Sequence, residues 1–156
     1  MRYFIYILSI VLIIHGCKNN SNPVASITDS TLSISQVRDS IQYTFAIPKA
    51  VFEIHDTLSA SITAFNQSTL PETLVIYMGN FQWSLKNDSG RTLMWGPEVI
   101  PQFVYRLELG SHQSAEIYAM HQAIMDTSGA PIVAGSYFLQ GKLYGTLLFI
   151  LNLSLH

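Results

Sequence analysis

Cysteine is almost absent from this sequence of 156 residues, because Cys17 is the only one. A single cysteine excludes an intrachain disulfide and a cysteine-rich zinc site. Charge is scarce as well, since charged residues make up 12% of the chain, against about 25% in typical globular proteins. The formal net charge is −2 and there is no basic run, so the composition does not suit nucleic-acid binding.

The motifs of several enzyme classes are also missing. The sequence has no Gly-x-Ser-x-Gly nucleophile elbow, no His-Glu-x-x-His zinc motif, no Gly-x-Gly-x-x-Gly pattern and no P-loop. His55, His112 and His121 would form a metal or general-base site only if the fold brought them together, and a surface histidine is the commoner case. We therefore predict a protein that is not an enzyme and has no metal and no cofactor.

The N-terminus has the pattern of a signal peptide. A short positive start, Met1-Arg2, precedes the apolar run Tyr3–Ile14, which only Ser9 interrupts. A membrane-spanning helix needs roughly 20 apolar residues, whereas a signal-peptide core needs about 7–15. The run therefore predicts export rather than a membrane span.

The next residues, Ile14-His15-Gly16-Cys17, resemble the lipobox of bacterial lipoproteins. In that motif a small residue precedes a cysteine that receives lipid and becomes the new N-terminus. The alternative is an ordinary secretory peptide with the cysteine as a bystander. We predict a lipoprotein signal peptide over 1–16, lipid attachment at Cys17 and a position in the cell envelope.

Residues 17–40 are rich in serine and asparagine and are predicted to be a tether. Flexible linkers of this kind span about 5–6 Å times the square root of their length. The alternation within 31–34 allows a short strand there. Lys18 stands where an aspartate would resemble an inner-membrane retention signal, so the outer membrane is expected if the organism has one. A single domain over 41–156 follows.

From residue 41 onward, apolar and polar residues alternate along short segments, as they do in half-buried strands. The expected strands are 41–47, 58–64, 73–77, 81–85, 91–95, 103–109, 114–125, 137–144 and 146–155, with a short edge segment at 50–54. No segment shows a capped helical period. About seven to nine strands with glycine and asparagine turns predict an all-β sandwich or barrel, with Leu147–Leu151 as a buried central strand.

The stretch from Leu58 to Tyr144 contains turn and core residues in a recognisable order. They are Asn66-Gln67-Ser68, Gly79, Phe81, Trp83, Asp88-Ser89-Gly90, Trp95, Gly110, Gly129, Val133, Gly135, Tyr137 and Gly141. Their order resembles the intracellular proteinase inhibitor family of bacilli, the BsuPI-like domain. The resemblance implies an immunoglobulin-like antiparallel β-sandwich and, from the founding member, inhibition of a serine protease. It brings no inhibitory residues to this sequence.

Two groups of residues are candidates for binding. The first is the loop Pro97, Glu98, Val99, Ile100 and Pro101. Proline fixes φ and lowers the entropy lost on binding, so an exposed Val-Ile pair in this loop would suit a protease cleft or a partner groove. The commoner role of such a loop is a crossover between two sheets.

The second group is aromatic and consists of Phe81, Trp83, Trp95 and Phe103. An exposed platform of these rings would bind a sugar or a peptide, whereas core positions are the commoner case for aromatic residues.

The favoured hypothesis is a lipid-anchored, non-enzymatic β-sandwich that binds another protein, with an envelope protease as the partner that the family resemblance implies. A structural or assembly lipoprotein without inhibitory activity is the first alternative, and a carbohydrate-binding module is the second. The sequence leaves the partner and the oligomeric state open.

Overall fold

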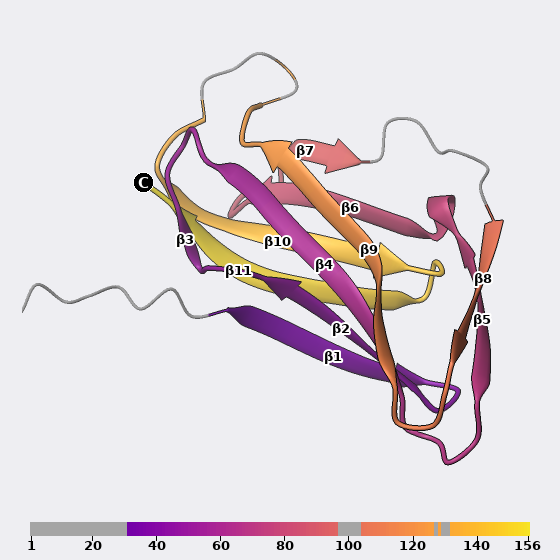
Figure 1. Cartoon of the computed structure of the whole chain (residues 1–156). Coiled ribbons are helices and arrows are strands. Elements are labelled where there is room, and N and C mark those ends of the chain that lie inside the picture. Colours follow the sequence, from indigo (N-terminus) through magenta and orange to yellow (C-terminus); the bar gives the residue numbers. More distant parts are fainter. Residues whose placement is uncertain (1–30, 97–103, 127, 129–131) are drawn as a thin grey trace, which may run out of the picture.

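The alternating segments form eleven β-strands in the residues that the computed structural model describes, which are 31–96, 104–126, 128 and 132–156 (Figure 1). The strands are β1 (Leu32–Arg38), β2 (Ile41–Ile47), β3 (Val51–Phe52), β4 (Thr57–Asn66), β5 (Glu72–Tyr77), β6 (Phe81–Asn87), β7 (Thr92–Gly96), β8 (Val104–Leu109), β9 (Ser114–Ala123), β10 (Gly135–Leu143) and β11 (Leu147–Leu155). A 3₁₀ turn, η1 (Met78–Asn80), links β5 to β6. Within these ranges there is no helix with the length and apolar character to cross a membrane.

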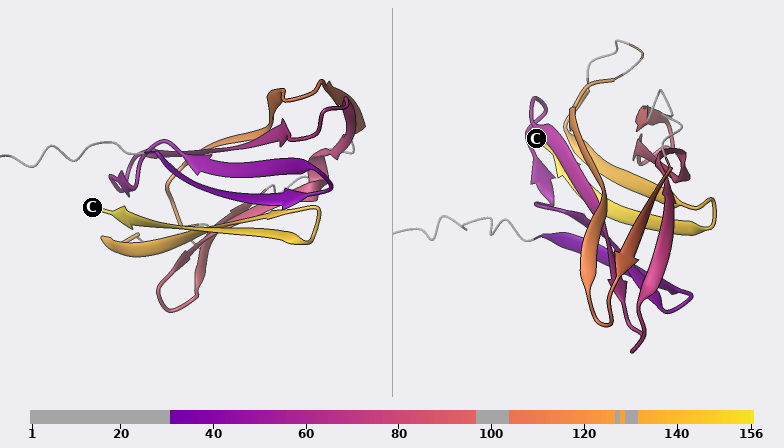
Figure 2. Two further views of the ribbon diagram at one scale, coloured as in Figure 1. Left: turned by 90° about the horizontal axis from the view of Figure 1, so that it is seen from below. Right: turned by 45° about the vertical axis from the view of Figure 1, so that its right-hand side comes forward.

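The strands form two main sheets that face each other as layers (Figure 2). One sheet has the order β1-β2-β4-β9, and the other has the order β3-β11-β10-β6-β7. All pairs are antiparallel except the pairing of β3 with β11. This arrangement confirms the predicted all-β antiparallel sandwich. The described strands exceed the expected seven to nine mainly because β1 and the two-residue β3 also pair.

The sheet begins at β1, inside the range 17–40 that the sequence assigned to the tether. Every residue of β1 has a partner on β2, from Leu32 opposite Ile47 to Arg38 opposite Ile41. The strand is easily overlooked because Ser33 and Ser35 occupy two of its exposed positions and its inward side chains are only partly buried. In the described part of the chain, the first strand is therefore β1, which pairs with β2 ahead of residue 41.

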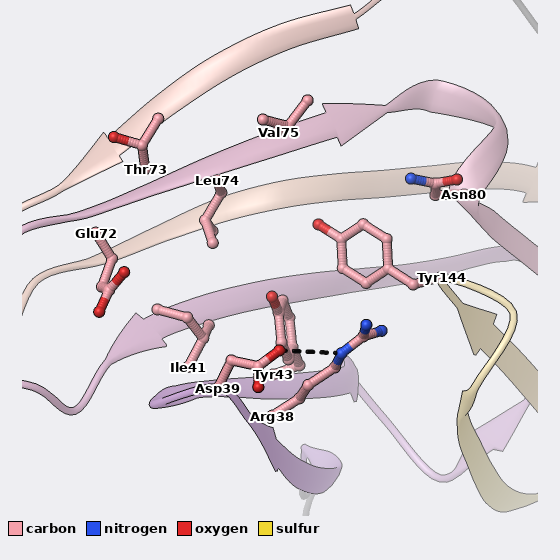
Figure 3. Close-up of a pocket in the computed structure, with 10 residues that line it drawn as sticks. All are labelled: Arg38, Asp39, Ile41, Tyr43, Glu72, Thr73, Leu74, Val75, Asn80 and Tyr144. Carbon is pink, nitrogen blue, oxygen red and sulfur yellow. Dashed lines mark hydrogen bonds and ion pairs between the residues drawn. The ribbon is translucent and has the colours of Figure 1, made fainter.

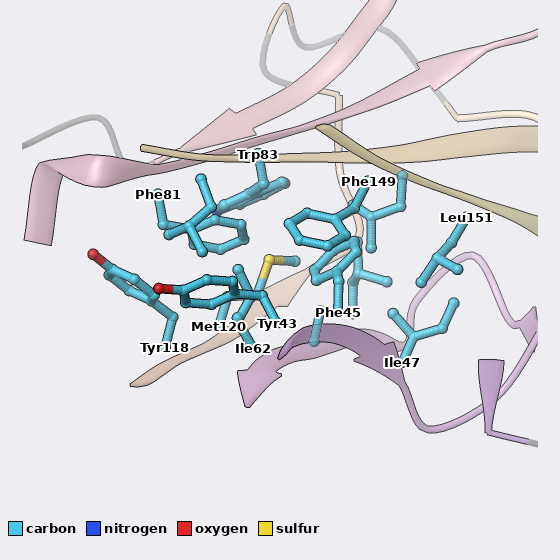
Figure 4. Packing of buried hydrophobic residues seen from close by; sticks show 14 of the residues in the cluster. Tyr43, Phe45, Ile47, Ile62, Phe81, Trp83, Tyr118, Met120, Phe149 and Leu151 are labelled. Atoms are coloured by element: carbon cyan, nitrogen blue, oxygen red, sulfur yellow. The ribbon is translucent and has the colours of Figure 1, made fainter. Parts of the chain in front are cut away.

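The core lies between the two layers and contains the inward side chains of both (Figure 4). On β2 the alternation is complete, since every second residue from Ile41 to Ile47 is buried. Aromatic rings bridge the layers, because Phe45 of one sheet lies 6.0 Å from Phe81 and 5.8 Å from Phe149 of the other, between ring centroids. Such contacts add to the stability gained from burial alone.

β11 has one buried face and one exposed face. The sequence predicts the run 147–151 to be a buried central strand, and Phe149 and Leu151 are indeed in the core. Leu148 and Ile150 face outward because the opposite face of this sheet is uncovered. The run 147–151 is apolar on both faces and hides the alternation, but Asn152 and Ser154, two and four residues after Ile150, mark the outward face in the sequence.

Side chains of β1 close the gap beside β11. The Gln36 amide donates a hydrogen bond to the Leu148 carbonyl, with an Nε2–O distance of 2.5 Å. Arg38 Nη1 donates to the Thr146 hydroxyl at 3.2 Å. These bonds connect the edges of the two sheets along a seam where no main-chain ladder joins β1 to β11.

β5 and β8 form a separate two-stranded sheet at one end of the sandwich, to the right in Figure 1. Its inner face packs on the core through Leu74, Ile76 and Leu109. Two tyrosine hydroxyls hold it against β9: Tyr118 donates to the Tyr77 carbonyl at 2.5 Å, and Tyr105 donates to the Ile117 carbonyl at 3.0 Å.

Candidate functional site

A pocket of about 380 Å³ opens where the β1–β2 turn, β5 and the β10–β11 turn meet (Figure 3). Its volume is within the range of roughly 300–1,000 Å³ that is common for ligand pockets. Polar groups from distant parts of the chain converge on it: Arg38, Asp39, Tyr43, Glu72, Asn80 and Tyr144. The pocket therefore combines a guanidinium, two carboxylates, two phenols and an amide.

Two tight turns at the rim of this pocket place non-glycine residues in the left-handed region. Asp39 and Ser40 have φ values of 51° and 66° in the two-residue hairpin between β1 and β2, and Tyr144 has a φ of 52° at the start of the β10–β11 turn. Asparagine, aspartate and glycine tolerate this region, whereas tyrosine rarely occupies it. Residues held in such conformations cluster at functional sites.

The two phenols lie against each other inside the pocket. The ring centroids of Tyr43 and Tyr144 are 5.8 Å apart in an edge-to-face arrangement. Burial raises the pKa of both hydroxyls. A phenol is uncharged at neutral pH in any case, and the raised pKa keeps both hydroxyls as donors and acceptors of hydrogen bonds further into the alkaline range.

The Arg38 guanidinium forms one wall and is held from two sides. It lies 5.8 Å from the centre of the Tyr144 ring, and its Nε is 3.3 Å from Oδ2 of Asp39. Across the pocket, the side chains of Glu72 and Asn80 form no hydrogen bond within the described residues, and Figure 3 shows them at opposite sides of the opening. A ligand would find polar groups without partners at both ends.

One edge of β5 borders this pocket. β5 pairs only with β8, so its other edge has no strand beside it in the described part of the chain. Four consecutive residues of β5, from Glu72 to Val75, line the pocket. The N–H and C=O groups of a free strand edge are available to pair with another extended chain.

The outward face of the β5–β8 sheet adds an apolar surface next to the pocket. Val75 is 39% exposed, Tyr77 48% and Val104 53%. Tyr77 and Val104 are directly opposite each other, so they lie on the same face. Burial raises the pKa of Tyr118, which bonds to the Tyr77 carbonyl from beneath, to about 12.

Three of the four residues of the predicted aromatic group are described, and they lie in two different environments. Phe81 and Trp83 point into the core, while Trp95 is exposed on the other face of the same sheet. Phe103 lies outside the described residues, as do Cys17 and the predicted loop 97–101. The described residues on either side of 97–103 are Gly96, which is opposite Trp83, and Val104, which is exposed.

The histidines are not brought together. His121 is near one end of β9 and exchanges a hydrogen bond with Ser59 at 2.9 Å, whereas His112 lies in the turn before the other end. His55 is exposed in the turn before β4. The described residues contain no group of three or more potential metal ligands.

Sequence reasoning missed the pocket because its walls come from three separate regions. Arg38, Asp39 and Ser40 were assigned to the tether, so their turn was not recognised. Two residues of turn-forming type between two alternating segments are a hairpin signal, and Asp39-Ser40 between β1 and β2 fits it. Nothing local connects this turn to Glu72 or Tyr144.

Comparison with known proteins gives no family and only weak structural likeness. No family model matches the chain, and no curated protein matches it. An alkylpurine DNA glycosylase from Pseudomonas fluorescens has a TM-score of 0.46 at 15% identity, over 77% of this chain and 31% of that one. β-Glucosidases from Erythrobacter marinus and Listeria innocua have TM-scores of 0.47 and 0.45 at 14% and 9% identity, over 75% and 78% of this chain.

This chain spans less than a third of each of those proteins, since it covers only 15% and 16% of the two glucosidases. At TM-scores below 0.5, the likeness carries no functional conclusion.

Proposed function

We propose that this protein is a lipid-anchored, non-enzymatic β-sandwich of the cell envelope that binds an extended segment of another protein along the free edge of β5. The observation that supports this most strongly is the position of that edge, because Glu72–Val75 line the pocket and no described strand pairs with them on that side. Cys17, in its lipobox-like setting, supplies the anchor.

The chemistry of strand addition fits this site. An extended segment that pairs with a sheet edge gains affinity from main-chain hydrogen bonds and specificity from pockets that receive alternate side chains. Here one side chain of the partner would enter between Glu72 and Asn80, and apolar side chains would pack on Val75 and Tyr77.

The partner class follows from the family resemblance. The BsuPI-like pattern implies a serine protease, and an anchored inhibitor would act on a protease of the envelope. A structural or assembly role would use the same edge with a different partner. The carbohydrate-binding alternative receives less support, because Phe81 and Trp83 are core residues.

The test places a photo-crosslinking residue at Thr73, which is exposed and lines the pocket. We expect the anchored protein to capture a defined envelope partner from this position. The matched control is the same residue at Ser33, which is exposed on the outer face of β1. Equal capture from both positions, or none from Thr73, would contradict the proposal.

A substitution next to this edge measures how much the site contributes to partner binding. Val75→Asp should weaken partner binding by about tenfold or more, because the partner would bury a carboxylate without a hydrogen-bond partner at a cost of about 1–3 kcal/mol or more, and 1.4 kcal/mol is a factor of ten. Purified protein titrated against a panel of serine proteases then separates inhibition from assembly. Inhibition that Val75→Asp does not weaken would place the binding site elsewhere.

A further inference from the structure

The outer face of the five-stranded sheet carries large apolar side chains and two lysines. Its exposed apolar residues are Trp95, Phe138, Leu148 and Ile150, with exposed fractions between 37% and 49%, and its charged residues are Lys86 and Lys142. We name this surface the lysine face. It is the side of the β10–β11 layer that points away from the other sheet (Figure 2).

Strand register brings these residues together from separate parts of the chain. Phe138 is opposite Lys86, and Lys142 is opposite Leu148. Gln140 of β10 is opposite Ile150 of β11 and opposite Ser84 of β6. Ser84 is in turn opposite Trp95 of β7. The apolar and basic side chains thus share one continuous surface over β11, β10, β6 and β7.

The charge on this face has one sign. The chain has more acidic than basic residues, ten against eight, yet the outward positions of β6, β7, β10 and β11 include no carboxylate. An anionic surface would be attracted to Lys86 and Lys142, with no carboxylate at the outward positions of these four strands to oppose it.

The outer face of the other sheet shows that this pattern is not general. Its outward positions carry small hydroxyl residues such as Ser33, Thr44 and Thr63. Val37 is the single exposed large hydrophobic residue on β1, β2, β4 and β9. The two faces are exposed by the same fold but differ in chemistry.

We propose that the lysine face lies against the anionic headgroups of the bilayer that holds the lipid anchor. This inference rests on the anchoring at Cys17 that is part of the proposed function. Fourteen residues separate Cys17 from Leu32, and a chain of that length reaches at most about 50 Å in any conformation. The face is therefore kept close to the membrane surface at high effective concentration.

The residue types suit that position. Tryptophan is enriched at the level of lipid headgroups, and amphipathic surfaces bind there through apolar burial combined with basic charge. Each lysine near an anionic leaflet strengthens the association about fivefold. The free edge of β5 belongs to another sheet and stays accessible to a partner.

The two tryptophans of the chain allow a direct test, because Trp83 is 7% exposed and Trp95 is 48% exposed. The mature lipoprotein is reconstituted in phosphatidylcholine vesicles with brominated acyl chains, with and without phosphatidylglycerol. We expect quenching of Trp95 that increases severalfold with phosphatidylglycerol. Trp95→Phe should abolish the change, which assigns the signal.

Charge variants provide the control. Lys86→Gln with Lys142→Gln should remove the dependence on phosphatidylglycerol. Ser33→Glu with Val37→Glu changes the net charge by the same amount on the opposite face and should retain it. Flotation of the vesicles measures the anchor separately. Flotation without quenching would overturn the docking of this face and leave the anchor intact, whereas loss of flotation would overturn both.

Discussion

Asn66 shows how much a single buried amide can organise. Its side chain is fully buried, and Nδ2 lies 2.8 Å from the Leu70 carbonyl and 3.1 Å from the carbonyls of Leu109 and Gly110. Its Oδ1 accepts the Ser68 N–H at 2.9 Å. The Asn-x-Ser pattern of the family resemblance therefore ties the end of β4 to the turn between β8 and β9.

We expect Asn66→Ala to lower the free energy of unfolding by about 2–4 kcal/mol, because buried carbonyls that lose their donor each cost about 1–3 kcal/mol. Urea denaturation measures this. Gln67→Ala, which changes an exposed neighbour, should stay within about 0.5 kcal/mol. A similar loss for both variants would show that the effect is not specific to the Asn66 hydrogen bonds.

Asp126 is the other buried polar side chain of the described core. The Ser128 hydroxyl and backbone N–H donate to it at 2.6 and 2.7 Å, and together with Arg91 at 2.7 Å they lower the pKa of its carboxyl. A lowered native pKa stabilises the fold above the ordinary carboxyl pKa of about 3.9. That contribution disappears as the pH falls through the native pKa.

The expected consequence is a stability that falls below about pH 4 and falls less steeply in Asp126→Asn. Urea midpoints measured from neutral to acidic pH test this. Asp88→Asn, at an exposed turn position, is the control and should follow the wild type. Parallel curves for wild type and Asp126→Asn would show that Asp126 does not carry the acid sensitivity.

At the scale of elements, the β6–β7 hairpin depends on a missing side chain. Gly96 lies opposite Trp83, and a Cβ atom there would be 2.7–2.9 Å from the Trp83 indole. That distance is too short for a real contact. The indole ring therefore occupies the space beside a strand residue that must stay small.

Gly96→Ala should destabilise the protein by about 1–3 kcal/mol, the usual cost of overpacking a core. Pairing it with Trp83→Phe should recover part of the loss, because the smaller ring frees the space. Thr92→Ala, at an exposed position of the same strand, should have little effect. Thermal unfolding of the four variants measures the coupling, and purely additive losses would disprove the steric explanation.

The sequence predicts most strands because their burial alternates in a simple pattern. On β4, Leu58, Ala60, Ile62 and Ala64 are buried as expected. β1 is harder to predict because its inward residues are only partly buried and its exposed positions mix serine with Val37 and Arg38. β11 shows the opposite problem, since apolar residues fill both faces over 147–151 and only Asn152 and Ser154 indicate which face is outward.

For the whole molecule, the sandwich could be predicted but its surfaces could not. Local alternation gives strands and a two-layer class, whereas the order β1-β2-β4-β9 depends on pairing between distant segments. The pocket needs Arg38, Glu72 and Tyr144 to meet, and the lysine face needs Lys86 beside Phe138. Such neighbours are set by register, which no short window of sequence contains.

The hydrogen bond from β1 to β11 affects whether two copies of this protein can pair through their β11 edges. An unpaired strand edge next to apolar side chains readily pairs with the same edge of another copy. Here the Gln36 amide satisfies the Leu148 carbonyl in place of a neighbouring strand. Molecules tethered to one membrane, as proposed, would collide often within two dimensions, and this bond removes one acceptor of the β11 edge from such pairing while the β5 edge stays open to a partner.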